Sequence, residues 1–138
     1  MRKSILGLIG ASFLVLSVAG CTHDQTTAAK GAATAWLKLV DTGNYAQSWD
    51  EAAAVMKSSV AKEQWQQILQ ANRAPLGTLL SRKLTSVTYT AELPGAPPGE
   101  YVVLKYASSF EHKSDAIETA TPTLDKDGRW RVSVYFVQ

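Results

Sequence analysis

The chain has 138 residues, 46% of them hydrophobic and 19% charged, and it contains one cysteine, Cys21. This length accommodates one compact domain behind a leader and is too short for two. The net charge of +2 at pH 7 is too small to create the basic field that nucleic-acid binding needs, which excludes that class of partner. A single cysteine cannot form an intramolecular disulfide, so a hydrophobic core must stabilise the fold.

The first 20 residues have the composition of a secretory signal. Two basic residues open the chain, an apolar run covers residues 5–18, and small residues precede Cys21. Glycines and serines interrupt the run, which is shorter than the roughly 20 apolar residues of a spanning helix. The stretch Val18-Ala19-Gly20-Cys21 resembles the lipobox of bacterial lipoproteins. That resemblance implies cleavage between Gly20 and Cys21 and attachment of diacylglycerol and acyl chains to the cysteine.

Acylation of Cys21 is expected to hold the protein at a membrane without a spanning helix, because several acyl chains anchor far better than one. It also removes a free thiol from an oxidising compartment. In lipoproteins an Asp after the cysteine commonly causes retention in the inner membrane, so Thr22 favours the outer membrane, facing the periplasm. Cleavage removes Arg2 and Lys3 from the 14 basic residues and leaves 12 against 12 acidic ones, a formally neutral chain.

We therefore divide the chain into a signal peptide over residues 1–20, a lipidated tether over 21–27 and an α+β domain over 28–138. The tether is polar, and His23 is expected to be a solvated part of it. An extended chain spans at most about 3.3–3.6 Å per residue, so this tether would hold the domain within roughly 20 Å of the bilayer.

The first half of the domain has helical periodicity and predicts three helices. The first covers residues 29–40, with Gly43 as its C-terminal stop. The second starts at Asn44, with Gln47 as a capping-box partner, and is expected to continue to about Ala53. The third covers residues 62–72.

The ends of the third helix carry two further predictions. Ala61 occupies the position where Ser or Thr would cap the helix, so either Ser59 caps it or the helix begins uncapped. Arg73 is expected to cap the carbonyl groups at its C-terminal end.

From Arg82 onward the period changes to two, which predicts strands over residues 82–92, 101–110, 117–124 and 130–137. Asp127-Gly128 indicates a tight turn before the last strand. Three helices followed by four antiparallel strands make an α+β fold in which the helices cover the inner face of one curved sheet. On the last strand, the side chains expected to share one face are Trp130, Val132, Val134 and Phe136.

Side chains suited to catalysis or metal binding are few. His112 is the one histidine of the domain, and its neighbour Glu111 would point to the opposite face of a strand. We expect His112 to be a solvated strand end rather than a catalytic base. One histidine, no second cysteine and no acidic cluster at ligand spacing predict no metal and no cofactor beyond the acyl chains on Cys21.

Several stretches form an ordered set of motifs: Ala35-Trp36-Leu37 and Asp41 to Asp50 near the start, Arg73 to Gly77 and Leu93 to Tyr101 in the middle, and Glu118-Thr119 and Asp127 to Val132 at the end. This set resembles the DUF4019 family of small bacterial exported proteins of unknown function. The resemblance covers nearly the whole domain. It implies a fold similar to the cone-shaped NTF2-like proteins and carries over no catalytic residues.

NTF2-like cones often enclose a pocket, and some are isomerases that use a buried carboxylate with a tyrosine. Glu118 is notable here, because it lies opposite in phase to Ile117 and Thr119 on a threonine-rich strand. The structural alternative is that this carboxylate pairs with an arginine. The candidate residues for a pocket or an interaction surface are Glu118, Asp50, Arg82, Tyr89, Tyr106, Tyr135 and His112.

Two functions from different classes follow. The favoured one is a non-catalytic envelope lipoprotein that binds an envelope protein or a small apolar ligand at the membrane surface. The alternative is a small NTF2-like enzyme of the isomerase or hydrolase type with an apolar pocket. A carboxylate at the bottom of an apolar cavity would favour the enzyme. A filled cone or an exposed apolar patch would favour the binding module, and the partner and oligomeric state stay open.

Overall fold

The computed structural model describes residues 19–138, so most of the predicted signal peptide lies outside the described residues. The helices are α1 (Ala19–Asp41), α2 (Tyr45–Asp50), α3 (Ala54–Ser59) and α4 (Lys62–Asn72), followed by a short 3₁₀ turn, η1 (Ala74–Leu76). The strands are β1 (Leu79–Thr90), β2 (Tyr101–Phe110), β3 (Lys113–Leu124) and β4 (Trp130–Val137). Within residues 19–138, no helix is long and apolar enough to cross a membrane.

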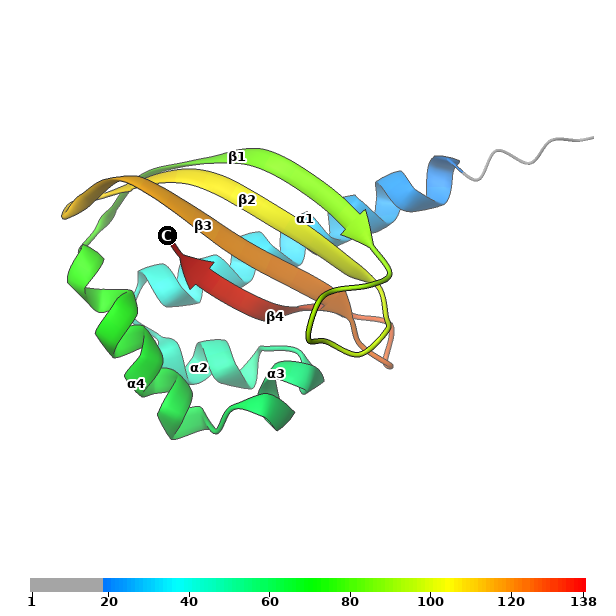
Figure 1. Cartoon of the computed structure of the whole chain (residues 1–138), viewed down its shortest axis with the longest axis horizontal. Coiled ribbons are helices and arrows are strands. Elements are labelled where there is room, and N and C mark those ends of the chain that lie inside the picture. The colour runs from blue at the N-terminus through cyan, green and yellow to red at the C-terminus, as the bar shows by residue number, and fades with distance from the viewer. Residues whose placement is uncertain (1–18) are drawn as a thin grey trace, which may run out of the picture.

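The strands form one open antiparallel sheet in the order β1-β2-β3-β4. In Figure 1, α1 passes behind this sheet and the other helices lie below it. The first turns of α1 project beyond the end of the sheet. The predicted α+β fold is confirmed, with helices first and an antiparallel sheet after them.

The described residues contain four α-helices rather than the predicted three, because the second predicted helix is divided. Ala53 has extended backbone angles and donates its N–H to the carbonyl of Val132 on β4 at 2.9 Å. This bond takes the chain out of helical register between α2 and α3. The predicted capping box is also wrong, since Asn44 makes no cap bond and its amide nitrogen donates to the Thr42 hydroxyl at 2.9 Å.

Helix α1 begins before the predicted domain and includes residues 21–27, for which the sequence predicts a tether. Its alanine-rich sequence favours a helix, and its buried positions recur at intervals of three or four residues. The helix ends at Asp41, and Gly43 follows with a φ of 76°, as predicted. The side chains of α1 buried against the sheet are Ala29, Ala33, Trp36, Leu37 and Val40.

Tryptophan side chains form the centre of the core. Trp36 packs against Trp65 and against Tyr135, at ring-centroid distances of 6.1 and 5.3 Å. Both indole nitrogens bond to the fully buried Ser48, Trp36 to its carbonyl at 2.7 Å and Trp65 to its hydroxyl at 3.0 Å. Trp49 donates to the carbonyl of Val60 at 2.8 Å. Satisfying each buried N–H in this way lets large side chains fill the space between the helices and the sheet.

The predicted alternation on β4 is wrong. The pairing of β3 with β4 shifts register between Thr121 and Pro122, so the strict two-residue period is interrupted. Val132 is fully buried and Phe136 is 42% exposed, although both were expected on one face. Tyr135 takes the inward position instead.

Helix α4 begins uncapped, one of the two predicted possibilities. Ala61 is its N-cap residue and makes no side-chain bond. The Ser59 hydroxyl donates to the carbonyl of Val55 at 2.7 Å, within α3, so it caps nothing. The prediction for Arg73 is wrong, because its side chain bonds to Asp41 and Gly77 rather than to the last carbonyls of α4.

Candidate functional site

Six polar side chains meet on the inner face of the sheet, where the ends of α1 and α4 approach it. We call this group the polar cluster. Glu118 lies at its centre and is fully buried. The members are Asp41 from α1, Arg73 from the end of α4, Arg82 from β1, Ser108 from β2, Glu118 from β3 and Tyr135 from β4.

Both carboxylate oxygens of Glu118 are occupied. Oε2 accepts from Arg82 Nε at 2.6 Å and from the Ser108 hydroxyl at 2.6 Å. Oε1 accepts from Arg82 Nη2 at 2.9 Å and from the Tyr135 hydroxyl at 2.7 Å. Since an ionised carboxylate has about four lone-pair sites, these four bonds leave it no free acceptor position.

A second carboxylate completes the charge balance. Asp41 accepts from Arg82 through both oxygens, at 2.7 and 2.9 Å, and from Arg73 Nη2 at 3.2 Å. Two guanidinium groups therefore face two carboxylates. Arg73 also donates to the carbonyl of Gly77 at 2.8 Å and lies over the ring of Phe110, 4.4 Å from its centroid. Its buried Nε has no protein partner.

The ionisation of the cluster follows from these contacts. Burial alone would lower the pKa of Arg82, but its hydrogen bonds to Asp41 and Glu118 outweigh burial and raise it. Burial raises the pKa of the Tyr135 phenol far above its usual range, and the negative charge of Glu118 raises it further. Arg82 is therefore fixed as a cation and Tyr135 as a neutral hydrogen-bond donor.

Strand register and one glycine position these groups. Arg82 lies directly opposite Ser108 on β2, and Glu118 pairs with the next inward residue, Tyr106. Gly77 has a φ of 77°, and a Cβ there would lie 2.7 Å from a carboxylate oxygen of Glu111. Glycine is needed at this position both for its backbone angles and for the close approach of that side chain.

Of the residues predicted from the sequence, Glu118, Arg82 and Tyr135 are brought together, with Glu118 paired to arginine as in the structural alternative. The ring of Tyr106 lies 6.0 Å from the guanidinium of Arg82. The other candidates lie elsewhere. Asp50 pairs with Lys62 at 2.8 Å, Tyr89 donates to Glu100 at 2.7 Å, and His112 is exposed in the turn between β2 and β3.

Three members of the cluster were not predicted. Ser108 is in phase with the inward residues Tyr106 and Phe110, so a polar residue at a core position was an available signal. Asp41 and Arg73 were interpreted only as helix ends. Their meeting depends on how α1 and α4 pack, and no local pattern shows that.

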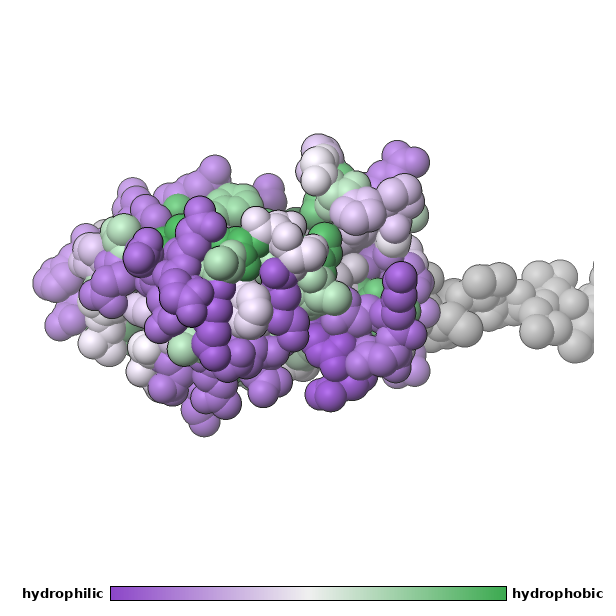
Figure 2. All heavy atoms as spheres, turned by 90° about the horizontal axis from the view of Figure 1, so that it is seen from below, coloured by the Kyte–Doolittle hydropathy of each residue, from purple (hydrophilic) through white to green (hydrophobic). Residues whose placement is uncertain are grey.

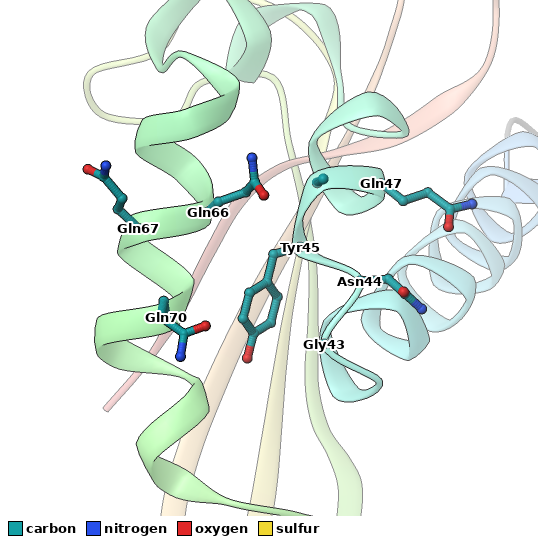
Figure 3. A pocket seen from close by; sticks show the side chains of 8 residues that line it. Gly43, Asn44, Tyr45, Gln47, Gln66, Gln67 and Gln70 are labelled. Carbon is teal, nitrogen blue, oxygen red and sulfur yellow. The ribbon is translucent and has the colours of Figure 1, made fainter.

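A surface groove of about 520 Å³ lies between the start of α2 and α4. Figure 3 shows Tyr45 facing α4, with Gln66 and Gln70 pointing toward it and Gln67 pointing away. Its lining is uncharged and includes no carboxylate, histidine or basic side chain. The rest of this helical side, seen from below in Figure 2, is largely hydrophilic with small hydrophobic areas.

Two other grooves lie near the β3–β4 turn and the edge of β4. The larger, about 770 Å³, is lined by paired charges: Arg131 bonds to Asp125 at 2.9 Å and to Asp127 at 2.8 Å. Hydrogen bonding to Arg131 holds the pKa of Asp127 at about 2. The smaller, about 290 Å³, is largely apolar. Glu118 lines none of these three grooves, and residues 19–138 contain no group of three His, Cys, Asp or Glu side chains placed for a metal ion.

The outer face of the sheet forms a different kind of surface. Figure 1 shows no helix in front of it, and only the loop after β1 crosses one end. Ile117 is 47% exposed and Phe136 is 42% exposed. We call this surface the open face, and its exposed members are Lys83, Lys105, Ala107, Ile117 and Phe136.

The chain was compared with protein families, curated proteins and solved structures. Neither the curated proteins nor the solved structures gave a match. Residues 32–135, which include every member of the polar cluster and every member of the open face except Phe136, match the family described as "Protein of unknown function (DUF4019)". The chain therefore belongs to the DUF4019 family.

Proposed function

We propose that the protein is a lipid-anchored protein of the bacterial envelope that binds a partner and catalyses no reaction. The observation that carries this proposal is the saturation of Glu118: the carboxylate best placed to act as a base already accepts four hydrogen bonds.

A catalytic carboxylate needs a free oxygen within reach of its substrate. Glu118 could reach a proton only if Arg82, Ser108 or Tyr135 released it. Tyr135, the tyrosine that would accompany it in an isomerase, already donates to it. The enzyme alternative therefore requires dismantling a buried ion pair, whereas a structural role requires no change.

Binding is supported by the open face. Its exposed Ile117 and Phe136 lie on a sheet surface that no helix covers. Exposed apolar residues gathered on one surface are characteristic of interaction sites. The α+β layout, with helices on one side of an open sheet, also supports an NTF2-like fold whose interior is filled.

The anchor is proposed at Cys21, after cleavage behind Gly20, with the outer membrane favoured by Thr22. Because residues 21–27 are helical, the connection to the domain is shorter than an extended tether. Ala29, the first buried residue of α1 from residue 23 onward, lies eight positions after Cys21. At 1.5 Å per residue, that helical stretch measures about 12 Å. The domain is then held beside the bilayer by a helical stalk.

The proposal is tested by comparing the natural chain with Cys21→Ser in a diderm bacterial host. The natural chain is expected to incorporate labelled palmitate, to partition into detergent and to give an N-terminal peptide with the mass of an acylated cysteine. Cys21→Ser is expected to lose all three properties. Equal membrane partitioning of both proteins without any acyl mass would overturn the anchor.

A further inference from the structure

We propose that the open face binds an acidic amphipathic helix of a partner protein. This inference rests on the proposed function and names the partner's chemistry. The open face has two lysines on one side and two exposed apolar side chains on the other.

The charged members of the open face are both lysines. Lys83 and Lys105 are exposed, and neither forms a salt bridge within the part of the chain that the structure describes. Asp115, two residues before Ile117 on β3, borders the open face and pairs with Lys113 at 3.7 Å. A complementary partner therefore carries carboxylates.

The strand register fixes how the lysines and the apolar residues are spaced. Lys105 pairs with Thr119, which pairs with Phe136. One row further along the sheet, Lys83 pairs with Ala107, which pairs with Ile117. Each lysine thus lies two strands away from an apolar side chain, a separation of roughly 9.5 Å at 4.7–4.9 Å per strand.

An α-helix lying across the strands matches this spacing. Residues i and i+7 of a helix lie on the same face, about 10.5 Å apart. A partner helix with a carboxylate two turns from an apolar residue can therefore reach a lysine and an apolar side chain in one row. In an extended segment, side chains on one face recur at about 6.8 Å, which does not fit two strand intervals.

Two other occupants fit less well. A second copy packed face to face would bring four lysines and no carboxylate of the open face into one interface, because an isologous interface uses the same patch twice. A bilayer is disfavoured by the stalk. In Figure 1, α1 runs behind the sheet and its first turns project beyond the end of the sheet, so the stalk does not emerge from the open face.

The test uses the acylated full-length protein in phosphatidylcholine nanodiscs and two synthetic helical peptides. The acidic probe carries two glutamates, each seven residues from a leucine, and the matched probe has lysines in place of the glutamates. Binding is measured by fluorescence polarisation and mapped by backbone amide NMR. The test variant is K83E/K105E, and the control K38E/K126E makes the same charge change at exposed lysines outside the open face.

The acidic probe is expected to bind, to shift the amides of Lys105, Ile117 and Phe136, and to bind K83E/K105E at least about tenfold more weakly, which corresponds to ~1.4 kcal/mol. The control variant is expected to bind within about twofold of the natural protein, a difference of ~0.4 kcal/mol. The lysine probe is expected to prefer K83E/K105E.

Three results would overturn the proposal: equal binding of the two probes, equal weakening in the control variant, or shifts outside the open face. Shifts on the open face caused by phosphatidylglycerol nanodiscs without peptide would assign the surface to lipid instead. Acylation is scored separately by mass. A chain without acyl groups therefore contradicts the proposed anchor, while failed peptide binding by an acylated chain contradicts only this inference.

Discussion

The two faces of the sheet reverse the usual distribution of residue types. On β3, Glu118 is fully buried while its neighbour Ile117 is 47% exposed. Charged side chains are almost never fully buried unless they are paired, and Glu118 meets that condition through Arg82. No such requirement explains an exposed isoleucine beside an exposed phenylalanine. The comparison indicates that the inner face holds the fold together, whereas the outer face is the surface to which we assign the proposed binding.

The largest expected effect is on the inner face. Glu118→Ala removes one of the two carboxylate partners of Arg82. It also leaves the buried hydroxyl groups of Ser108 and Tyr135 without their acceptor. Breaking a buried ion pair typically costs about 3–5 kcal/mol, and we expect a loss of that size in the free energy of unfolding measured with urea. The neighbouring change Ile117→Thr on the open face is the control, expected within about 0.5 kcal/mol. Similar losses of stability for both variants would show that the two faces do not differ in their contribution to the fold.

Tyr135→Phe tests one hydrogen bond of the cluster while keeping the ring against Trp36. A bond to a charged group contributes about 1.5–3 kcal/mol, so we expect a loss in that range. The pKa of Tyr135 is raised in the folded state, so the unfolded chain releases this proton first. Stability is therefore lost as the pH rises above about 10, the pKa of an unperturbed tyrosine. The variant is expected to show a smaller alkaline loss; an identical pH profile would show that Tyr135 titrates normally.

A substitution at the start of α4, away from both faces of the sheet, provides a reference for the two preceding variants. Ala61→Ser supplies the missing cap of α4, and the backbone of Ala61 already has the extended angles that a cap residue needs. A cap of this kind contributes about 1 kcal/mol, so the melting temperature is expected to rise without any change in peptide binding. The matched variant Ala61→Val lacks the hydroxyl and is not a favoured cap residue. A rise of equal size in both variants would show that the gain does not come from capping.

The smallest effect is expected for an exposed ion pair. Asp127 has a pKa of about 2 because it bonds to Arg131, below the value of about 3.9 for an unperturbed aspartate. The pair's contribution is therefore present above pH 4 and disappears as the pH falls through 2. Asp127→Asn is expected to remove this acid-dependent part and to change stability little at pH 7. A large loss at pH 7 would mean that exposed pairs rival the buried cluster.

The sequence predicts the elements of this fold well where periodicity is strong. The boundaries of β2 and β4 were correct, because both strands are rich in β-branched and aromatic residues. The division between α2 and α3 was missed, since it depends on the bond from Ala53 to Val132, 79 positions along the chain. The prediction of which β4 side chains share a face was wrong, because the register shift at Thr121 cannot be seen in the alternation of residue types along β4.

The candidate site was partly predictable. Glu118 was singled out by its phase on a threonine-rich strand, and Arg82 and Tyr135 were among its possible partners. The contributions of Asp41 and Arg73 follow only from the packing of two helix ends against the sheet. The open face was not predicted, because Phe136 was expected to share a face with Val132, which is buried.

The division between the two faces is tested most directly by one double variant, K83A/K105A, with stability and binding measured on the same preparation. The free energy of unfolding is expected to stay within about 0.5 kcal/mol of the natural protein, as for surface substitutions generally. Affinity for the acidic helical probe is expected to fall at least about tenfold, or ~1.4 kcal/mol. Unchanged affinity, or a loss of stability comparable to that of Glu118→Ala, would contradict this division of roles between the two faces.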